Sequence, residues 1–107
     1  MANRHRGEIA ASLGGKPYTL CLTLGALAEL EDAYGGIDLL ALAQRFEQGS
    51  IRAVDAIRVI GAGLRGGGHD VSDAEVAAMP VDGGAAGYVA IVAQLLEATF
   101  APAGGGE

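Results

Sequence analysis

Clusters of glycine divide this chain of 107 residues into short segments. The chain has 18 glycines, and glycine weakens the middle of a helix or strand because it loses more conformational freedom on folding than other residues. The clusters at 14–15, 35–36, 66–68 and 83–84 are therefore expected to separate secondary-structure elements. The length suits one small domain, which we expect over residues 1–100, followed by a disordered tail of small residues at 101–107.

The first cluster, Gly14-Gly15, separates two short runs with alternating apolar residues. A glycine pair suits the positive φ angles of a two-residue hairpin turn. That turn would pair Ile9 with Leu20 and place Pro17 opposite Ser12, where its missing N–H removes no ladder bond. The sequence therefore predicts an N-terminal β-hairpin with one apolar face.

Helical spacing begins after the hairpin. Thr23 is a plausible N-cap, and Gly35-Gly36 is expected to end the first helix. A second helix is expected over residues 37–48, and a third is expected from Ile51 with Ser50 as its cap. The predicted apolar stripes, at steps of three and four residues, are Leu24, Leu27, Leu30 and Tyr34; Leu39, Leu42, Ala43 and Phe46; and Ile51, Val54, Ile57, Ile60 and Leu64.

Charged residues on these helices are interpreted as solvated faces. Glu29, Glu31 and Asp32 would form the exposed face of the first helix, and Arg52 and Arg58 flank Asp55 three residues away on either side. Such spacing is typical of ion pairs on an exposed helix surface.

The segment "VIGAGLRGGG" contains Gly61, Gly63 and Gly66 at the spacing of a dinucleotide-binding loop. That loop needs a strand before the glycines and a helix directly after them. Here a helical stripe precedes the glycines and a loop follows. We therefore interpret Gly61 as a position of close helix packing and Gly66 to Gly68 as the end of the helix.

Two further helices are expected in the last third of the chain. Ser72 and Glu75 have the spacing of a capping box, with Val71 and Val76 placed to form a hydrophobic staple, and Pro80 closes this short helix. The last helix follows Gly83-Gly84. Its predicted apolar side is formed by Tyr88, Val89, Val92, Leu95, Leu96 and Phe100. The whole pattern predicts an α+β fold, an N-terminal β-hairpin followed by a bundle of four or five short helices.

The charge balance argues against a nucleic acid or a membrane as partner. The formal charge is −6, which repels phosphate groups unless the basic residues are gathered on one face, and the sequence shows no such gathering. Arg4, His5 and Arg6 are interpreted as a solvated terminus. There is neither a signal peptide pattern nor an apolar run of about 20 residues, so we expect a soluble, cytoplasmic protein.

No set of residues predicts catalysis. Cys21 is the only cysteine, so no Cys-based zinc site is expected, and no serine has a base in a recognisable motif. The polar cluster of His69, Asp70, Asp73 and Glu75 matches no calcium loop, and acids collect at a helix N-terminus because of its dipole. We expect no enzyme activity, no cofactor and no metal.

Several segments resemble a known family. "RGE" near the start, "LTLGALAELE", and "GAGLRGGG" followed by "VSDAEVAAMPV" are similar to the small tail protein of gene transfer agents. These are phage-like particles encoded by alphaproteobacteria and related to siphophage tails. The resemblance covers about residues 3–100.

The resemblance implies a role in tail morphogenesis without catalytic residues. Such proteins resemble tail assembly chaperones, which hold the tape measure protein soluble; the same family is also described as a tail tube protein. Expected partners are the tape measure protein, the major tail protein or further copies of this chain. The leucines of residues 24–34 and 37–48 could offer apolar surface to a partner, although amphipathic stripes usually face the core.

Overall fold

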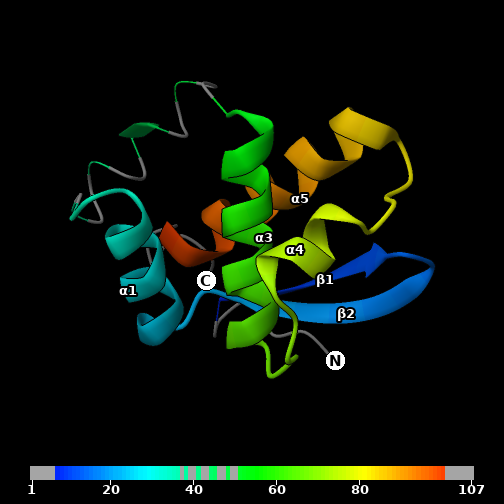
Figure 1. Ribbon diagram of the computed structural model, residues 1–107, viewed down its shortest axis with the longest axis horizontal. Helices are drawn as coiled ribbons and strands as arrows, with labels where there is room; N and C mark the ends of the chain where they lie inside the picture. The colour runs from blue at the N-terminus through cyan, green and yellow to red at the C-terminus, as the bar shows by residue number, and fades with distance from the viewer. Residues whose placement is uncertain are drawn as a thin grey trace, which may run out of the picture.

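A computed structural model describes residues 7–36, 38, 41, 44, 45, 48 and 51–100. Over these residues an antiparallel hairpin is followed by four helices, which confirms the predicted α+β fold (Figure 1). The helix α3 lies in the centre and contacts β2, α1, α4 and α5. The elements are β1 (Glu8–Leu13), β2 (Lys16–Cys21), α1 (Leu24–Ala33), α3 (Ala53–Gly66), α4 (Asp73–Ala77) and α5 (Gly84–Phe100).

The hairpin has the predicted register. Ile9 pairs with Leu20 and Ser12 with Pro17. Gly14 and Gly15 both have positive φ, +59° and +81°, as a type I′ turn requires. The buried side chains of the hairpin lie on one face, which packs against α3 and α5. An isolated two-stranded sheet is only marginally stable in water, so the helices stabilise this one.

The first helix begins and ends at the predicted signals. Thr23 Oγ1 accepts a hydrogen bond from Ala26 N at 3.1 Å. At the other end, Gly36 N–H donates to Glu31 O and Gly35 N–H to Asp32 O, the bond pattern of a Schellman motif. Both glycines have positive φ, which is why the chain has glycine here.

The apolar stripe predicted for α1 is wrong at its first residue. Leu24 is 80% exposed, whereas Ala26, Leu27 and Leu30 are buried. The helix faces α3 with the side that contains Ala26, so Leu24, in the first turn, points away from the core.

The second predicted helix falls largely outside the described residues. Leu39, Leu42, Ala43 and Phe46, its predicted apolar residues, all lie outside them, as does the predicted cap Ser50. The described residues Ala41, Gln44 and Arg45 have helical backbone, and Gln48 N–H donates to Gln44 O. The basic residues Arg4 and Arg6, His5 and the tail at 101–107 are also outside the described part.

The central helix α3 is rotated relative to the prediction. It begins at Ala53, two residues after Ile51, and its first turn is capped by Asp55, which accepts a hydrogen bond from Arg52 N at 2.9 Å. Val54 is 38% exposed, so the predicted stripe is wrong there. The buried side includes Asp55, Ala56, Val59, Ile60 and Leu64, because α1, β2 and α5 surround the helix on more than one face.

The last two helices begin close to their predicted signals. Ser72 Oγ accepts from Glu75 N, and Glu75 Oε1 accepts from Ser72 N, so the capping box of α4 is confirmed. In α5, Ile91, Val92 and Leu95 are buried, whereas Val89 is 46% exposed and the predicted stripe is wrong at that residue. No helix within the described ranges is long and apolar enough to cross a membrane.

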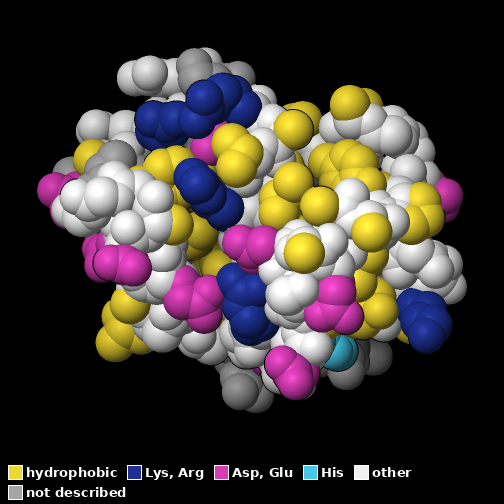
Figure 2. Space-filling view, viewed as in Figure 1, with side chains coloured by type: hydrophobic (Ala, Val, Ile, Leu, Met, Phe, Trp, Pro, Cys, Tyr) yellow, Lys and Arg dark blue, Asp and Glu magenta, His cyan; other side chains and the backbone are white. Residues whose placement is uncertain are grey.

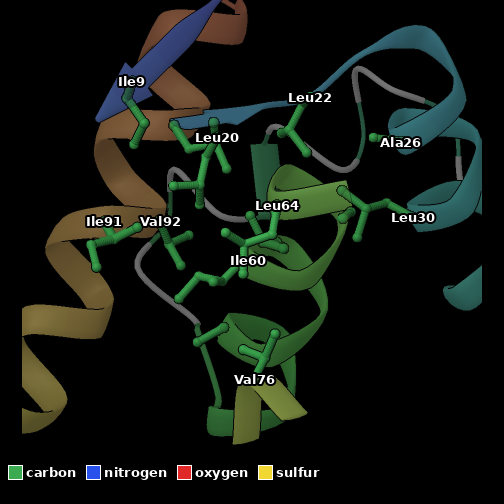
Figure 3. Packing of buried hydrophobic residues seen from close by; sticks show 14 of the residues in the cluster. Ile9, Leu20, Leu22, Ala26, Leu30, Ile60, Leu64, Val76, Ile91 and Val92 are labelled. Carbon is green, nitrogen blue, oxygen red and sulfur yellow. The ribbon is translucent and has the colours of Figure 1, made fainter. Parts of the chain in front are cut away.

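The core lies where the hairpin, α3 and α5 meet. Ile9 and Leu20 from the hairpin, Ile60 and Leu64 from α3, and Val92 from α5 converge there (Figure 3). Leu20, Ile60, Leu64 and Val92 have no exposed surface.

Candidate functional site

The glycines of "GAGLRGGG" bring α3 against the hairpin. A Cβ atom on Gly66 would lie 2.0 Å from Cys21 O, and one on Gly67 would lie 2.0 Å from Thr19 O. The helix then ends as predicted, with Gly68 N–H donating to Arg65 O and His69 N–H to Leu64 O. These glycines lie at the C-terminal end of a helix, whereas a phosphate site uses an N-terminal end with free N–H groups. Their conformation and contacts are explained by packing.

The acidic cluster after these glycines binds an arginine. Asp73 Oδ1 accepts from Arg65 Nη1 at 3.0 Å, and Val71 O accepts from the same nitrogen at 2.9 Å. Glu29 of α1 accepts from Arg65 Nη2 at 2.7 Å. Arg65 thus connects α1, α3 and the start of α4. Gly61 leaves the room for this contact, since a Cβ there would lie 2.2 Å from Asp73 Oδ1.

Of the other members of the predicted polar cluster, His69 and Glu75 have separate contacts and Asp70 is exposed. His69 packs edge-on against the ring of Tyr18, with 4.9 Å between ring centroids. Glu75 caps α4. In the described part of the chain no group of three or more His, Cys, Asp or Glu side chains is placed to hold a metal ion.

Asp55 is fully buried, which corrects its interpretation as part of a solvated face. The Tyr34 hydroxyl donates to Asp55 Oδ1. The nearest guanidinium nitrogens of Arg52 and Arg45 lie 3.7 Å and 4.0 Å from Oδ2. Arg45 and Arg58 also lie over the ring of Tyr34, at 5.3 Å and 5.2 Å from its centroid. Three of the chain's seven Lys and Arg residues are therefore gathered around the Tyr34–Asp55 pair, a gathering that sequence spacing does not show.

This environment shifts two pKa values in opposite directions. Burial alone would raise the pKa of Asp55, but the Tyr34 hydroxyl, the Arg52 N–H and the nearby guanidinium groups outweigh it, so the pKa of Asp55 is lowered. Burial, followed by the hydrogen bond to Asp55, raises the pKa of Tyr34 to about 12. At neutral pH Asp55 is ionised and Tyr34 is neutral, so the pair holds α1 against the start of α3.

An apolar groove opens beside this basic cluster, between α3, α4 and α5. Its volume is about 280 Å³. Figure 2 shows apolar side chains exposed in this region, with basic side chains gathered over the start of α3. The lining residues are Ile51, Arg52, Ala53, Ala56, Ile57, Ile60, Val76, Ala77, Ala85, Tyr88 and Val89.

The groove is lined mainly by apolar side chains and presents no reactive group. Tyr88 turns its hydroxyl to Met79 O, so its ring is the part available to the groove. Arg52, whose side chain is 69% exposed, is the one charged residue of the lining. The volume is just below the range of about 300–1,000 Å³ usual for pockets that enclose small ligands. The groove therefore suits a few apolar side chains of another protein better than a small molecule.

Sequence reasoning placed the groove residues in the core. The helical spacing predicts Ile57 and Val89 on buried stripes, and the alanines at 53, 56, 77 and 85 give no sequence signal of a surface groove. Alanines on three neighbouring helices leave room for a partner, but only the packing of α3, α4 and α5 shows that they face a common groove.

Comparison with known families settles the relationship of the chain. A family model described as "Phage tail tube protein, GTA-gp10" matches residues 6–102. The chain belongs to this family. It is therefore a gene transfer agent tail protein, as the resemblance indicated. For this GTA-gp10 family member, no curated protein and no solved structure matches the chain.

Proposed function

We propose that this GTA-gp10 family member is a tail assembly chaperone that binds an apolar helical segment of the tape measure protein. The observation that supports this role is the open groove between α3, α4 and α5. A groove of this kind, lined by aliphatic side chains and small residues, suits an amphipathic helix that inserts apolar residues at helical spacing. The acidic body of the chain, with a formal charge of −6, would keep the complex soluble.

The groove also has features that distinguish it from an accidental gap in the surface. Its wall contains Val89, a large apolar residue that is 46% exposed. The alanines allow a helix backbone to approach closely, and Arg52 at the rim offers a charge to an acidic residue of the bound segment. Binding would take place in the cytoplasm of the particle-producing bacterium, before the tube subunits polymerise.

Co-expression of the chain with the tape measure protein, followed by affinity capture, tests this proposal. Val89→Asp places a charge in the groove and should reduce capture at least tenfold. Val54→Asp is the matched control, because Val54 has similar exposure on α3 but does not line the groove. It should leave capture unchanged. Equal capture by the two variants, with both folded by circular dichroism, would contradict the groove as the binding site.

A structural tail component is the second candidate function, and the family description favours it. A tube subunit needs enough strand to close a ring by extending a sheet, and the described residues contain a single two-stranded sheet. This candidate predicts that the chain is present in finished particles at the copy number of stacked rings.

A further inference from the structure

The carboxylate of Asp55 takes its hydrogen bonds from groups other than the guanidinium groups beside it. Its Oδ1 accepts from the Tyr34 hydroxyl, and its Oδ2 accepts from the backbone N–H of Arg52 at 2.9 Å. The nearest side-chain nitrogens of Arg52 and Arg45 lie 3.7 Å and 4.0 Å from Oδ2, whereas an N–H···O hydrogen bond spans about 2.7–3.2 Å. These two guanidinium groups therefore attract Asp55 by charge alone.

The arginine pair, Arg45 and Arg52, has donors available to another acceptor. A guanidinium group has five N–H donors. Arg45 Nε is buried and has no hydrogen-bond partner in the described part of the chain, and the side chain of Arg52 is 69% exposed. The pair also brings two positive charges to the single negative charge of Asp55, because Tyr34 is neutral at pH 7. Both hydrogen-bond donors and positive charge are thus left over at this place.

Arg65 shows how an arginine with a structural role is held in this chain. Its guanidinium group donates to Glu29 at 2.7 Å and to Asp73 at 3.0 Å, so two carboxylates balance one positive charge. The ion pairs of the arginine pair involve Asp55 and no second carboxylate among the described residues. This difference favours a role in binding for the arginine pair.

The arginine pair lies at one end of the groove. Arg52 belongs to the groove lining, and that lining contains no acidic residue. Arg45 approaches the same oxygen of Asp55 as Arg52 does, so both guanidinium groups border the groove at the start of α3. The ring of Tyr34, 5.3 Å away, holds the guanidinium group of Arg45 by a cation–π contact. Figure 2 shows basic side chains over the start of α3 beside exposed apolar side chains. A segment bound in the groove would therefore reach the pair.

We propose that the arginine pair binds carboxylate side chains of the helical segment that occupies the groove. This inference rests on the proposed chaperone function and names the chemistry of the partner. The segment is an amphipathic helix with an apolar face for the groove and with Asp or Glu at the end of that face that lies over the start of α3. A carboxylate there can accept two hydrogen bonds from one guanidinium group, and it supplies the negative charge that Asp55 alone does not. Nucleic acid offers negative charge without an apolar face, and the formal charge of −6 repels it.

Two variants that each remove one charge test the arginine pair. Arg52→Gln and Arg45→Gln should each capture about three- to fivefold less co-expressed tape measure protein than the parent chain at about 0.1 M salt, the effect of losing one ion pair at a partly exposed site. Because Arg45 does not line the groove, a loss in Arg45→Gln reports on charge and not on groove shape. Lys16→Gln is the matched control. It removes the same charge from an exposed residue at the start of β2 and should capture as much as the parent chain.

Salt separates the charged contact from the apolar one. At about 1 M salt the Debye length falls to about 3 Å, so the parent chain, Arg52→Gln and Arg45→Gln should then capture amounts within about twofold of one another. Val89→Asp acts on the apolar contact and should remain deficient at both salt concentrations. Circular dichroism of each variant confirms that it is folded.

The outcomes distinguish this inference from the chaperone function. If Val89→Asp loses capture while Arg52→Gln and Arg45→Gln behave as Lys16→Gln does, the carboxylate contact is overturned and the groove stands. If the parent chain captures no tape measure protein, the chaperone function fails and this inference fails with it. Binding of a single-stranded oligonucleotide by the parent chain but not by Arg52→Gln would assign the arginine pair to phosphate groups and would also overturn the proposal.

Discussion

Replacing Gly66 by alanine should destabilise the protein, although alanine is the better helix former. A Cβ at this position would lie 2.0 Å from Cys21 O and 3.4 Å from Ala26 Cβ. The first contact is with backbone, so α3 must move away from β2 and lose packing with it. Overpacking of this kind costs about 1–3 kcal/mol, against a gain of about 1 kcal/mol from helix propensity. Because the clash is with backbone at a buried junction, we expect an overpacking cost near the upper end of its range and therefore a net loss of about 2 kcal/mol in the free energy of unfolding.

Gly25→Ala is the matched control for this prediction. Gly25 also lies in a helix, but the nearest atom to its Cβ position is 3.9 Å away. This variant should be unchanged or more stable by up to about 1 kcal/mol. Urea unfolding followed by circular dichroism gives both free energies, and a loss of about 2 kcal/mol lowers the melting temperature by roughly 8–16 °C in a domain of this size. If Gly66→Ala is as stable as Gly25→Ala, the packing explanation of the glycine-rich segment is wrong.

Two further predictions concern the core and the buried pair. Leu64→Ala should lower the free energy of unfolding by about 2–5 kcal/mol, because Leu64 has no exposed surface. Leu24→Ala should change it by no more than about 0.5 kcal/mol in the same urea experiment. Equal effects of the two variants would contradict the assigned core. Tyr34→Phe removes a hydrogen bond to a buried carboxylate and should cost about 1–3 kcal/mol at pH 7. Since folding raises the pKa of Tyr34 to about 12, the parent chain should lose stability from about pH 10, where an unfolded tyrosine ionises, up to pH 12, and the variant should lose less. Folding lowers the pKa of Asp55, so the stabilisation by its carboxylate is present above about pH 3.9, the unfolded value, and is lost as the pH falls below it. The urea midpoint measured against pH checks both limits. Parallel profiles for the parent chain and Tyr34→Phe would contradict the assigned coupling of Tyr34 and Asp55.

Features that depend on neighbouring residues could be predicted from the sequence. The turn at Gly14-Gly15 and the capping box of Ser72 and Glu75 each involve residues within three positions of one another. The ends of α1 and α3 at glycine clusters are of the same kind. Local backbone chemistry decides these features, so the sequence alone contains the information.

The buried face of each helix could not be predicted in the same way. The central helix α3 has apolar residues on several sides, and a stripe through Val54 and Ile57 has the same spacing as one through Ala56 and Val59. The choice between them depends on α1, β2 and α5, which pack around the helix. Ile57, on the stripe that remains partly exposed, lines the groove, although its helical spacing alone predicts core.

The cluster around Asp55 depends on contacts between distant parts of the chain. Arg52 and Arg58 lie close to Asp55 in sequence and suggested an exposed ion pair. The hydrogen bond to Asp55 comes instead from the hydroxyl of Tyr34, which is 21 residues away and lies at the end of α1. Sequence spacing contains no signal for that contact, so neither the burial of Asp55 nor the change in its pKa could be foreseen.

The chaperone role is tested most directly by quantitative mass spectrometry of purified gene transfer agent particles. A protein that holds the tape measure protein before the tube forms should be absent from finished particles while remaining abundant in the producing cells. We therefore predict far less than one copy of this chain per particle. A copy number equal to that of stacked tube rings would contradict the chaperone role and establish the chain as a structural tail protein.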